Sequence, residues 1–257
     1  MRIKISISLS LLALSVVLAV AAANYLTEKP DYLNPCRLDD SGFQKCLAAN
    51  LQVLFSKWKD GLPGTNTLTT IDPLHIKRIK ISPSNGAIVF NAELRNVQIK
   101  GASRAVVQSA SYDPSSHTAK TATNAPKLRF EFDYKVKGHI LALNLNSQGK
   151  GYFEADDATL NSEMFVKPRI TPEAAFADVQ GVNTNLKIGG FKIRLENLFG
   201  GNKDLEDTAH VLFNENWRDF FELMRPTIEQ TVDIVLLGRF KKTFEYVPAN
   251  YFIENFH

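Results

Sequence analysis

The sequence predicts an α+β fold: a long C-terminal helix wrapped by a strongly curved antiparallel β-sheet, with a short N-terminal helix. Three observations predict it. A helical pattern of apolar residues runs without interruption from Leu205 to about Phe240. Between Ile76 and about Leu198, apolar and polar residues alternate with the period of two that is typical of strands. A segment from about Gly42 to Asp60 again has helical spacing.

The N-terminal segment Met1 to Ala23 has the three parts of a secretory signal peptide. Arg2 and Lys4 give a positive start, Leu9 to Val20 are apolar, and Ala21-Ala22-Ala23 form a small-residue cleavage site. A membrane anchor is the alternative, but the apolar stretch is short for one. The sequence therefore predicts a secreted, extracellular protein whose residues 24–257 form a single elongated domain.

The charge of the chain argues against a nucleic-acid partner. Without the predicted signal peptide, 28 basic and 27 acidic side chains remain, so no basic field would attract nucleic acid or an anionic membrane. After Ala23, no segment approaches 18 uninterrupted apolar residues, so we expect no stable membrane insertion.

The chain has two cysteines, Cys36 and Cys46. In an exported protein, such a close pair predicts one disulfide, which here closes a loop of about ten residues. Two free thiols or half of a metal site are the alternatives, but no histidine lies at ligand spacing from them.

The first predicted helix has signals at both ends. Ser41 and Gln44 match a capping box, and Gly61 provides a stop. In the strand region, Lys127 to Lys137 alternates most regularly, with Leu128, Phe130, Phe132, Tyr134 and Val136 on one face and charged residues on the other. Short turns between such segments favour antiparallel connections.

The C-terminal segment is apolar over about 200° of its circumference, about twice the stripe of an ordinary surface helix. Leu205, Leu212, Leu223 and Ile234 belong to this apolar arc. A curved sheet wrapped around the helix would cover both apolar surfaces. Because such a sheet cannot follow a long helix closely, we expect an elongated apolar cavity between them.

Motifs for catalysis and cofactor binding are missing from the sequence. It has no Gly-X-Ser-X-Gly elbow, no His-Glu-X-X-His pair, no phosphate-binding glycine loop and no dinucleotide fingerprint. The histidines are scattered singly, which is typical of surface residues, and Glu206-Asp207 resembles a solvated loop doublet. We therefore predict neither an enzyme nor a metal or cofactor site.

Five short motifs carry a resemblance to a known family. They are Asn34-Pro35-Cys36 with Cys46-Leu47, Gly61-Leu62-Pro63 followed by Ile71 to Ile76, Leu195 to Asn202, Phe213 to Trp217, and Phe244 to Phe252. Each is similar, in the same order, to a segment of the insect takeout and juvenile-hormone-binding protein family. The resemblance spans almost the whole chain after Ala23.

The resemblance implies a tubular lipid-binding (TULIP-like) fold with an internal tunnel that carries a hydrophobic ligand. Hormone carriers of this family usually have a second disulfide, which this chain lacks, so it is more similar to the takeout branch. Gly61-Leu62-Pro63-Gly64-Thr65 also differs from the family's usual Gly-Ile-Pro-Glu-Leu.

We therefore expect a secreted carrier of an elongated hydrophobic ligand, such as a terpenoid, a fatty acyl compound or a semiochemical. The alternatives are a secreted interaction or signalling protein with a filled core, whose receptor or other partner the sequence does not identify, and an esterase. Tyr134 has two readings: a hydrogen bond to a ligand oxygen, or one to the backbone. The candidate tunnel residues are Leu51, Leu54, Trp58, Phe90, Phe130, Phe132, Tyr134, Phe213, Phe220, Met224 and Ile228.

Overall fold

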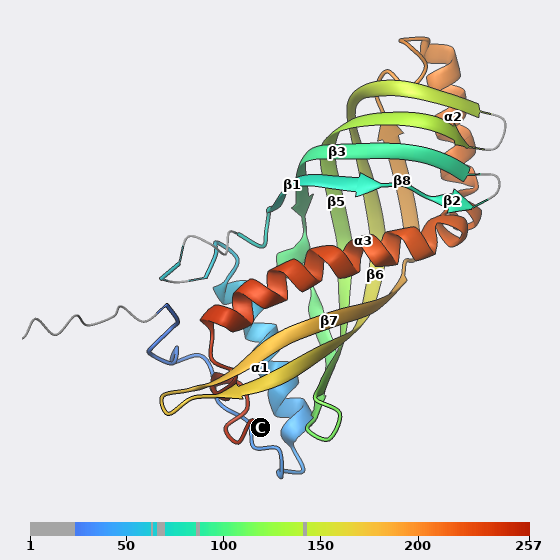
Figure 1. Cartoon of the computed structure of the whole chain (residues 1–257). Coiled ribbons are helices and arrows are strands. Elements are labelled where there is room, and N and C mark those ends of the chain that lie inside the picture. The colour runs from blue at the N-terminus through green and yellow to red at the C-terminus, as the bar shows by residue number, and fades with distance from the viewer. Residues whose placement is uncertain (1–23, 63, 66–69, 86–87, 141–142) are drawn as a thin grey trace, which may run out of the picture.

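The structure is a computed structural model of the chain, and it describes residues 24–62, 64–65, 70–85, 88–140 and 143–257. The predicted signal peptide, Met1 to Ala23, and Pro63 of the Gly61-Leu62-Pro63 motif lie outside these residues. The described chain begins with one helix, continues through eight strands and ends with two helices (Figure 1). The helices are α1 (Phe43–Lys57), α2 (Lys203–Glu215) and α3 (Trp217–Tyr246). The strands are β1 (Leu74–Ile81), β2 (Ser84–Asn85), β3 (Ile88–Lys100), β4 (Val106–Asp113), β5 (Thr118–Ile140), β6 (Leu143–Ile170), β7 (Ala175–Lys187) and β8 (Gly190–Leu195).

All eight strands belong to one antiparallel sheet, as the alternating pattern predicted. Strands β5 and β6 are the longest and pair along most of their length. The first half of β5 pairs with β4 and its second half with β3, whereas β6 pairs first with β8 and then with β7. The sheet therefore has two halves, which lie at the top and the bottom of Figure 1.

The predicted alternation in β5 is confirmed. Phe132, Tyr134 and Val136 are buried, whereas Lys135 and Lys137 between and after them are exposed. Side chains on one face of this strand therefore pack into a core, and those on the other face meet water.

Small residues occupy the junction between the two halves of the sheet. Ala125 of β5 pairs with Ala158 of β6, and the next opposed position is taken by Pro126 and Asp157, which are absent from the ladder of pairs. Proline has no amide hydrogen to donate, and Asp157 has a φ of 48°. A small cluster of four buried alanines, Ala105, Ala125, Ala155 and Ala158, lies at this junction.

The prediction of one unbroken helix from Leu205 to Phe240 is wrong. Asn216 ends α2 and precedes α3, with φ −105° and ψ 26°. Its side-chain Nδ2 donates to the Leu212 carbonyl at 2.9 Å. Two residues earlier, the Asn214 side chain accepts from the Ile193 N–H at 2.8 Å and donates to the Ile193 carbonyl at 3.2 Å. Because asparagine bonds the backbone with its side chain, these residues favour a helix end, and the long C-terminal helix is α3 alone.

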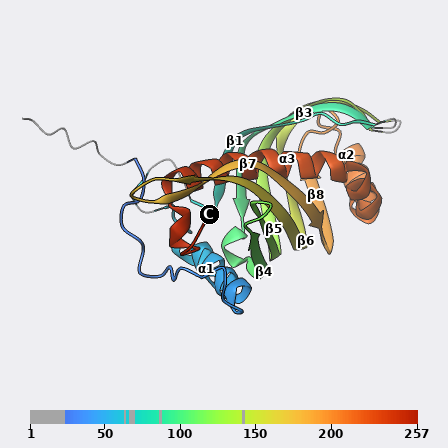
Figure 2. The ribbon, with the colours of Figure 1, turned by 60° about the horizontal axis from the view of Figure 1, so that its bottom comes forward.

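Four residues of the predicted apolar arc are on the surface. Leu205 is 52 % exposed, Leu212 45 %, Leu223 38 % and Ile234 67 %. The break at Asn216 explains the first two, because α2 and α3 do not share one helical axis (Figures 1 and 2). No helix in the described ranges is long and apolar enough to cross a membrane.

The N-terminal helix is confirmed, but its predicted capping box is wrong. Gly42 is the N-cap residue and provides no side-chain cap. The Asp40 carboxylate instead accepts from the Gly42 N–H at 2.7 Å, and the Asp40 carbonyl accepts from the Phe43 N–H. A tight turn therefore leads into α1, and Ser41 stays exposed. The predicted stop holds, since Gly61 has a φ of 111°.

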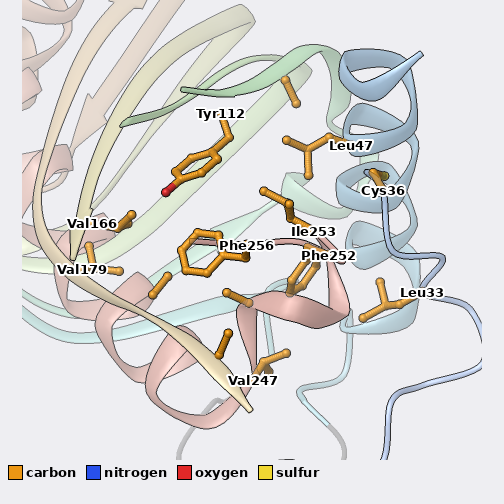
Figure 3. Packing of buried hydrophobic residues seen from close by; sticks show 14 of the residues in the cluster. Leu33, Cys36, Leu47, Tyr112, Val166, Val179, Val247, Phe252, Ile253 and Phe256 are labelled. Carbon is orange, nitrogen blue, oxygen red and sulfur yellow. The ribbon is translucent and has the colours of Figure 1, made fainter. Parts of the chain in front are cut away.

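The predicted disulfide between Cys36 and Cys46 is confirmed, with Cα atoms 5.9 Å apart. Cys36 also pairs with the C-terminal segment, because its N–H donates to the Phe252 carbonyl and its carbonyl accepts from the Glu254 N–H. Figure 3 shows Cys36 and Leu33 beside α1, with Phe252 and Ile253 nearest to them and Phe256 farther along the segment, toward Tyr112. The disulfide thus joins α1 to both ends of the domain.

Removing this disulfide should destabilise the protein. The Cys36→Ser/Cys46→Ser double variant should lose about 2–3 kcal/mol of unfolding free energy, because the loop of about ten residues is short. Urea denaturation of the variant and of the wild type, each with and without reductant, measures the loss. An equal midpoint for oxidised and reduced wild type would contradict the prediction.

Candidate functional site

Two clusters of buried apolar side chains lie at opposite ends of the sheet. The upper cluster, in the upper half of the sheet, has as its buried members Leu94, Val97, Phe132, Tyr134, Val136, Leu145, Leu198 and Ala209. The lower cluster, between α1, β4, β7 and the C-terminal segment, includes Leu33, Leu47, Trp58, Leu62, Tyr112, Val166, Val179, Val247, Phe252, Ile253 and Phe256.

The candidate tunnel residues fall into three groups. Trp58 is buried in the lower cluster, and Leu51 and Leu54 pack against it. The second group lies at the upper cluster. Phe132 and Tyr134 are buried members of that cluster, and Phe90, Phe130 and Phe213 pack against it. The third group is Phe220, Met224 and Ile228, all on α3.

The third group lies between the two clusters. Phe220, Met224 and Ile228 are partly buried, and neither cluster, within the described residues, includes them. Phe220 meets Phe213 edge to face, with ring centroids 4.9 Å apart. Lower on the same helix, Leu237, Phe240 and Phe244 pack against the lower cluster. The first two-thirds of α3 thus include apolar side chains that are partly shielded from water yet belong to neither packed cluster.

Polar contacts attach α3 to the free edge of β7. The Glu229 carboxylate accepts from the Leu186 N–H at 2.8 Å, and the Asp233 carboxylate accepts from the Thr184 hydroxyl at 2.7 Å. The first of these bonds satisfies a backbone N–H of an edge strand, which would otherwise lack a protein partner. Helix α3 contacts the sheet mainly through β7, and it has only a few contacts with β8 and β1. The helix therefore lies along one edge of the sheet and away from its central strands (Figure 2).

Aromatic rings cover the sheet face of the upper cluster. Phe153 of β6 stacks on Phe130 with centroids 4.0 Å apart, and it lies 5.8 Å from Phe132 and 5.7 Å from Phe191. Phe153 is absent from the sequence-based candidates because it lies outside the alternating segment, Lys127 to Lys137, that identified Phe130 and Phe132. The feature that identifies Phe153 is its position opposite Phe130 in the β5–β6 ladder. The sequence alone does not specify this strand pairing.

The hydroxyl of Tyr134 is already engaged. It donates to the Glu196 carbonyl at 2.8 Å, which is the backbone bond that the sequence left open as one of two readings. Burial raises the pKa of Tyr134 to about 12, and the charges of Glu206 and Glu196 act in the same direction. Tyr134 contributes its ring to the upper cluster, and its hydroxyl ties β5 to the end of β8.

A separate hollow of about 390 Å³ lies over β3, β5, β6 and the end of β8. It is lined mostly by charged and polar side chains, among them Arg129, Glu131 and Arg194. The Arg129 guanidinium lies 3.9 Å from the centre of the Tyr152 ring and pairs with Glu131 at 2.8 Å and Glu154 at 2.6 Å. Such a polar surface does not suit a hydrophobic ligand.

Two residues of α2 differ from their sequence-based interpretation. His210 is only 6 % exposed, although a lone histidine is typical of the surface. Glu206 lies on a helix and has a buried Oε1 atom, whereas its doublet with Asp207 was interpreted as solvated loop charge. The Leu195 N–H donates to His210 Nε2 at 2.9 Å. In the part of the chain that the structure describes, no group of acidic, histidine and cysteine residues could hold a metal ion.

The buried His210 should make stability depend on pH. Burial lowers the pKa of His210, Arg194 acts in the same direction, and Glu206 and Asp207 oppose it. The unfolded chain therefore binds a proton below about pH 6.5 more readily than the folded chain, so the unfolding free energy should fall as the pH drops through this value. His210→Gln keeps an acceptor for the Leu195 N–H and should show a smaller fall in denaturation curves. If the unfolding free energies of the wild type and of His210→Gln fell equally as the pH dropped, the prediction would be contradicted.

A curved antiparallel sheet with a long C-terminal helix along it defines the tubular lipid-binding class of fold. The model of the haemolymph juvenile hormone binding protein family matches residues 13–254, and the chain belongs to this family. It is 22% identical to the circadian clock-controlled protein daywake of Drosophila yakuba and to that of Drosophila melanogaster, over 88% of each chain. Takeout 1 of Epiphyas postvittana has a similar solved structure, with a TM-score of 0.73, 19% identity, and coverage of 85% of this chain and 98% of that one.

Proposed function

We propose that the protein is a secreted carrier that binds an elongated hydrophobic ligand between α3 and the sheet and has no catalytic role. The observation that carries the proposal is the set of partly buried apolar residues on α3, Phe220, Met224 and Ile228, which lie between two packed clusters. Membership in a family named for hormone binding in haemolymph supports a carrier in general.

The dimensions suit a long, narrow ligand. The part of α3 between the clusters, residues 217–236, is about 29 Å long at 1.5 Å per residue. Phe220, Met224 and Ile228 in this part of α3 are aromatic or aliphatic, so binding would come mainly from burial of apolar surface. A ligand that buries roughly 300 Å² would gain about 7–8 kcal/mol before ordering costs. That gain corresponds to micromolar affinity, which permits both loading and release.

Export is part of the proposal. The signal-peptide pattern of Met1 to Ala23 would direct the chain out of the cell, leaving 24–257 as the mature domain. The Cys36–Cys46 disulfide supports this assignment, because such bonds persist in oxidising compartments.

Competitive displacement of a fluorescent apolar probe, N-phenyl-1-naphthylamine, tests the proposal. Long-chain fatty acids, alcohols and terpenoids should displace the probe saturably with one site per chain, and native mass spectrometry should show the corresponding adduct. A protein with a filled core would take up neither the probe nor the lipids. That result would favour the alternative function, recognition of a protein partner through the surface.

A further inference from the structure

Helix α2 exposes three apolar side chains to water and places two titratable side chains, Glu206 and His210, on or beside the face that meets the sheet. Val211 is 54 % exposed, as are Leu205 and Leu212 to similar degrees, whereas Ala209 and His210 are buried. Ala209 belongs to the upper cluster and Phe213 packs against it. Glu206, His210 and Phe213 follow one another at intervals of four and three residues, so they share the face that meets this cluster.

The hydrogen bonds of His210 fix which of its nitrogen atoms has the proton. Because the Leu195 N–H donates to Nε2, Nε2 is an acceptor, and in the neutral ring the hydrogen is on Nδ1. Within the described chain, His210 Nδ1 is buried and has no hydrogen-bond partner. The site thus has one buried donor without an acceptor, which is a costly arrangement unless something else fills it.

One turn earlier on the same face, Glu206 has the complementary defect. Its Oε1 atom is buried and, among the described residues, has no donor. The two atoms are not bonded to each other, although residues four apart on a helix are neighbours. A group placed between them could accept from His210 Nδ1 and donate to Glu206 Oε1. Ala209, the chain neighbour of His210, belongs to the upper cluster together with Tyr134, so this pair lies beside the apolar side chains of that cluster.

We propose that Glu206 and His210 form the binding site for a hydroxyl group at one end of the ligand, so that the carrier prefers long-chain or terpenoid alcohols. This inference rests on the proposed carrier function. A hydroxyl both accepts and donates, so it satisfies both buried atoms at once. An ester, ketone or ether oxygen would accept from His210 and leave Glu206 unpaired, and a carboxylate would also meet the negative charge of Glu206.

Matched ligands test the inference without any change to the protein. In the probe-displacement assay, 1-hexadecanol should bind about tenfold more tightly than hexadecyl methyl ether, because the ether cannot donate to Glu206. Equal affinities would show that the pair is bridged by water alone, and the inference would fail while the carrier function stood. If neither compound bound saturably, the carrier function itself would fail.

A variant with a matched control locates the preference. Glu206→Met removes the acceptor and keeps a side chain of similar length, so it should weaken hexadecanol binding about tenfold and leave the ether unchanged. Glu215→Met changes an exposed glutamate of the same helix and should retain the preference. Thermal unfolding confirms that both variants fold. A Glu206→Met protein that still prefers the alcohol would overturn the assignment.

Discussion

Ile228→Trp should lower the affinity for long-chain lipids by at least about tenfold, the effect of losing roughly 1.4 kcal/mol of binding free energy. Ile228 is partly buried in the stretch of α3 between the two clusters. An indole ring there would occupy volume that the proposed ligand needs. Because Ile228 belongs to neither packed cluster, the larger ring should cost the fold less than overpacking a filled core would.

Ile234→Trp is the matched control for this prediction. Ile234 lies on the same helix but is 67 % exposed, so the same substitution there adds the ring to the surface. Probe displacement should give wild-type affinity for this variant, and thermal unfolding should show that both variants fold. If Ile228→Trp bound lipid as tightly as Ile234→Trp, the ligand could not lie along this part of α3.

Phe252→Ala should be the most destabilising single change, costing about 3–5 kcal/mol of unfolding free energy. The Phe252 ring is 4 % exposed and lies edge to face with Trp58 and Phe244, at centroid distances of 6.4 and 6.0 Å. It therefore joins the C-terminal segment, the end of α1 and the end of α3 (Figure 3). Its removal would leave a cavity where three segments meet.

Chemical denaturation measures this loss, and Phe165→Ala is its control. Phe165 is 40 % exposed on β6, so its truncation should cost less than about 1 kcal/mol. A loss below about 1 kcal/mol for Phe252→Ala would show that the lower cluster is loosely packed. That result would contradict the proposed joining of these three segments by Phe252.

Local patterns account for what the sequence predicted well. The alternation from Lys127 to Lys137 identified the buried face of β5 because side chains of a strand alternate between its two faces wherever it pairs. The Cys36–Cys46 disulfide followed from the inferred compartment and the close spacing. The fold class followed from the order of helical and strand segments, each of which has its own period.

Apart from the capping box, where the neighbouring Asp40 forms the turn, the errors come from partners that are distant in the chain. The break at Asn216 depends on Asn214, whose side chain bonds Ile193 of β8, and no periodicity reveals that contact. The orientation of α2 depends in the same way on His210 and the Leu195 N–H. The helical pattern could show that Leu205 and Phe213 lie on helices, but it could not show which side of each helix the sheet would cover.

The same reason limits the prediction of the site. Aromatic residues in β5 were found because they alternate with charges, whereas Phe153 required knowledge of the strand pairing. Glu206 was interpreted as a solvated loop residue because it belongs to an acidic doublet, and His210 as a surface residue because it is a lone histidine. The packing of α2 against β8 shows that His210 and the Oε1 atom of Glu206 are buried.

Photo-cross-linking tests the central claim most directly. A long-chain alcohol with a diazirine at mid-chain would be bound to the protein, irradiated and located by peptide mass spectrometry. The account predicts that the label concentrates on the α3 stretch containing Phe220, Met224 and Ile228, and that excess unlabelled hexadecanol abolishes it. A label confined to exposed residues such as Leu205 and Val211, or one that competitor does not reduce, would contradict a ligand held between α3 and the sheet.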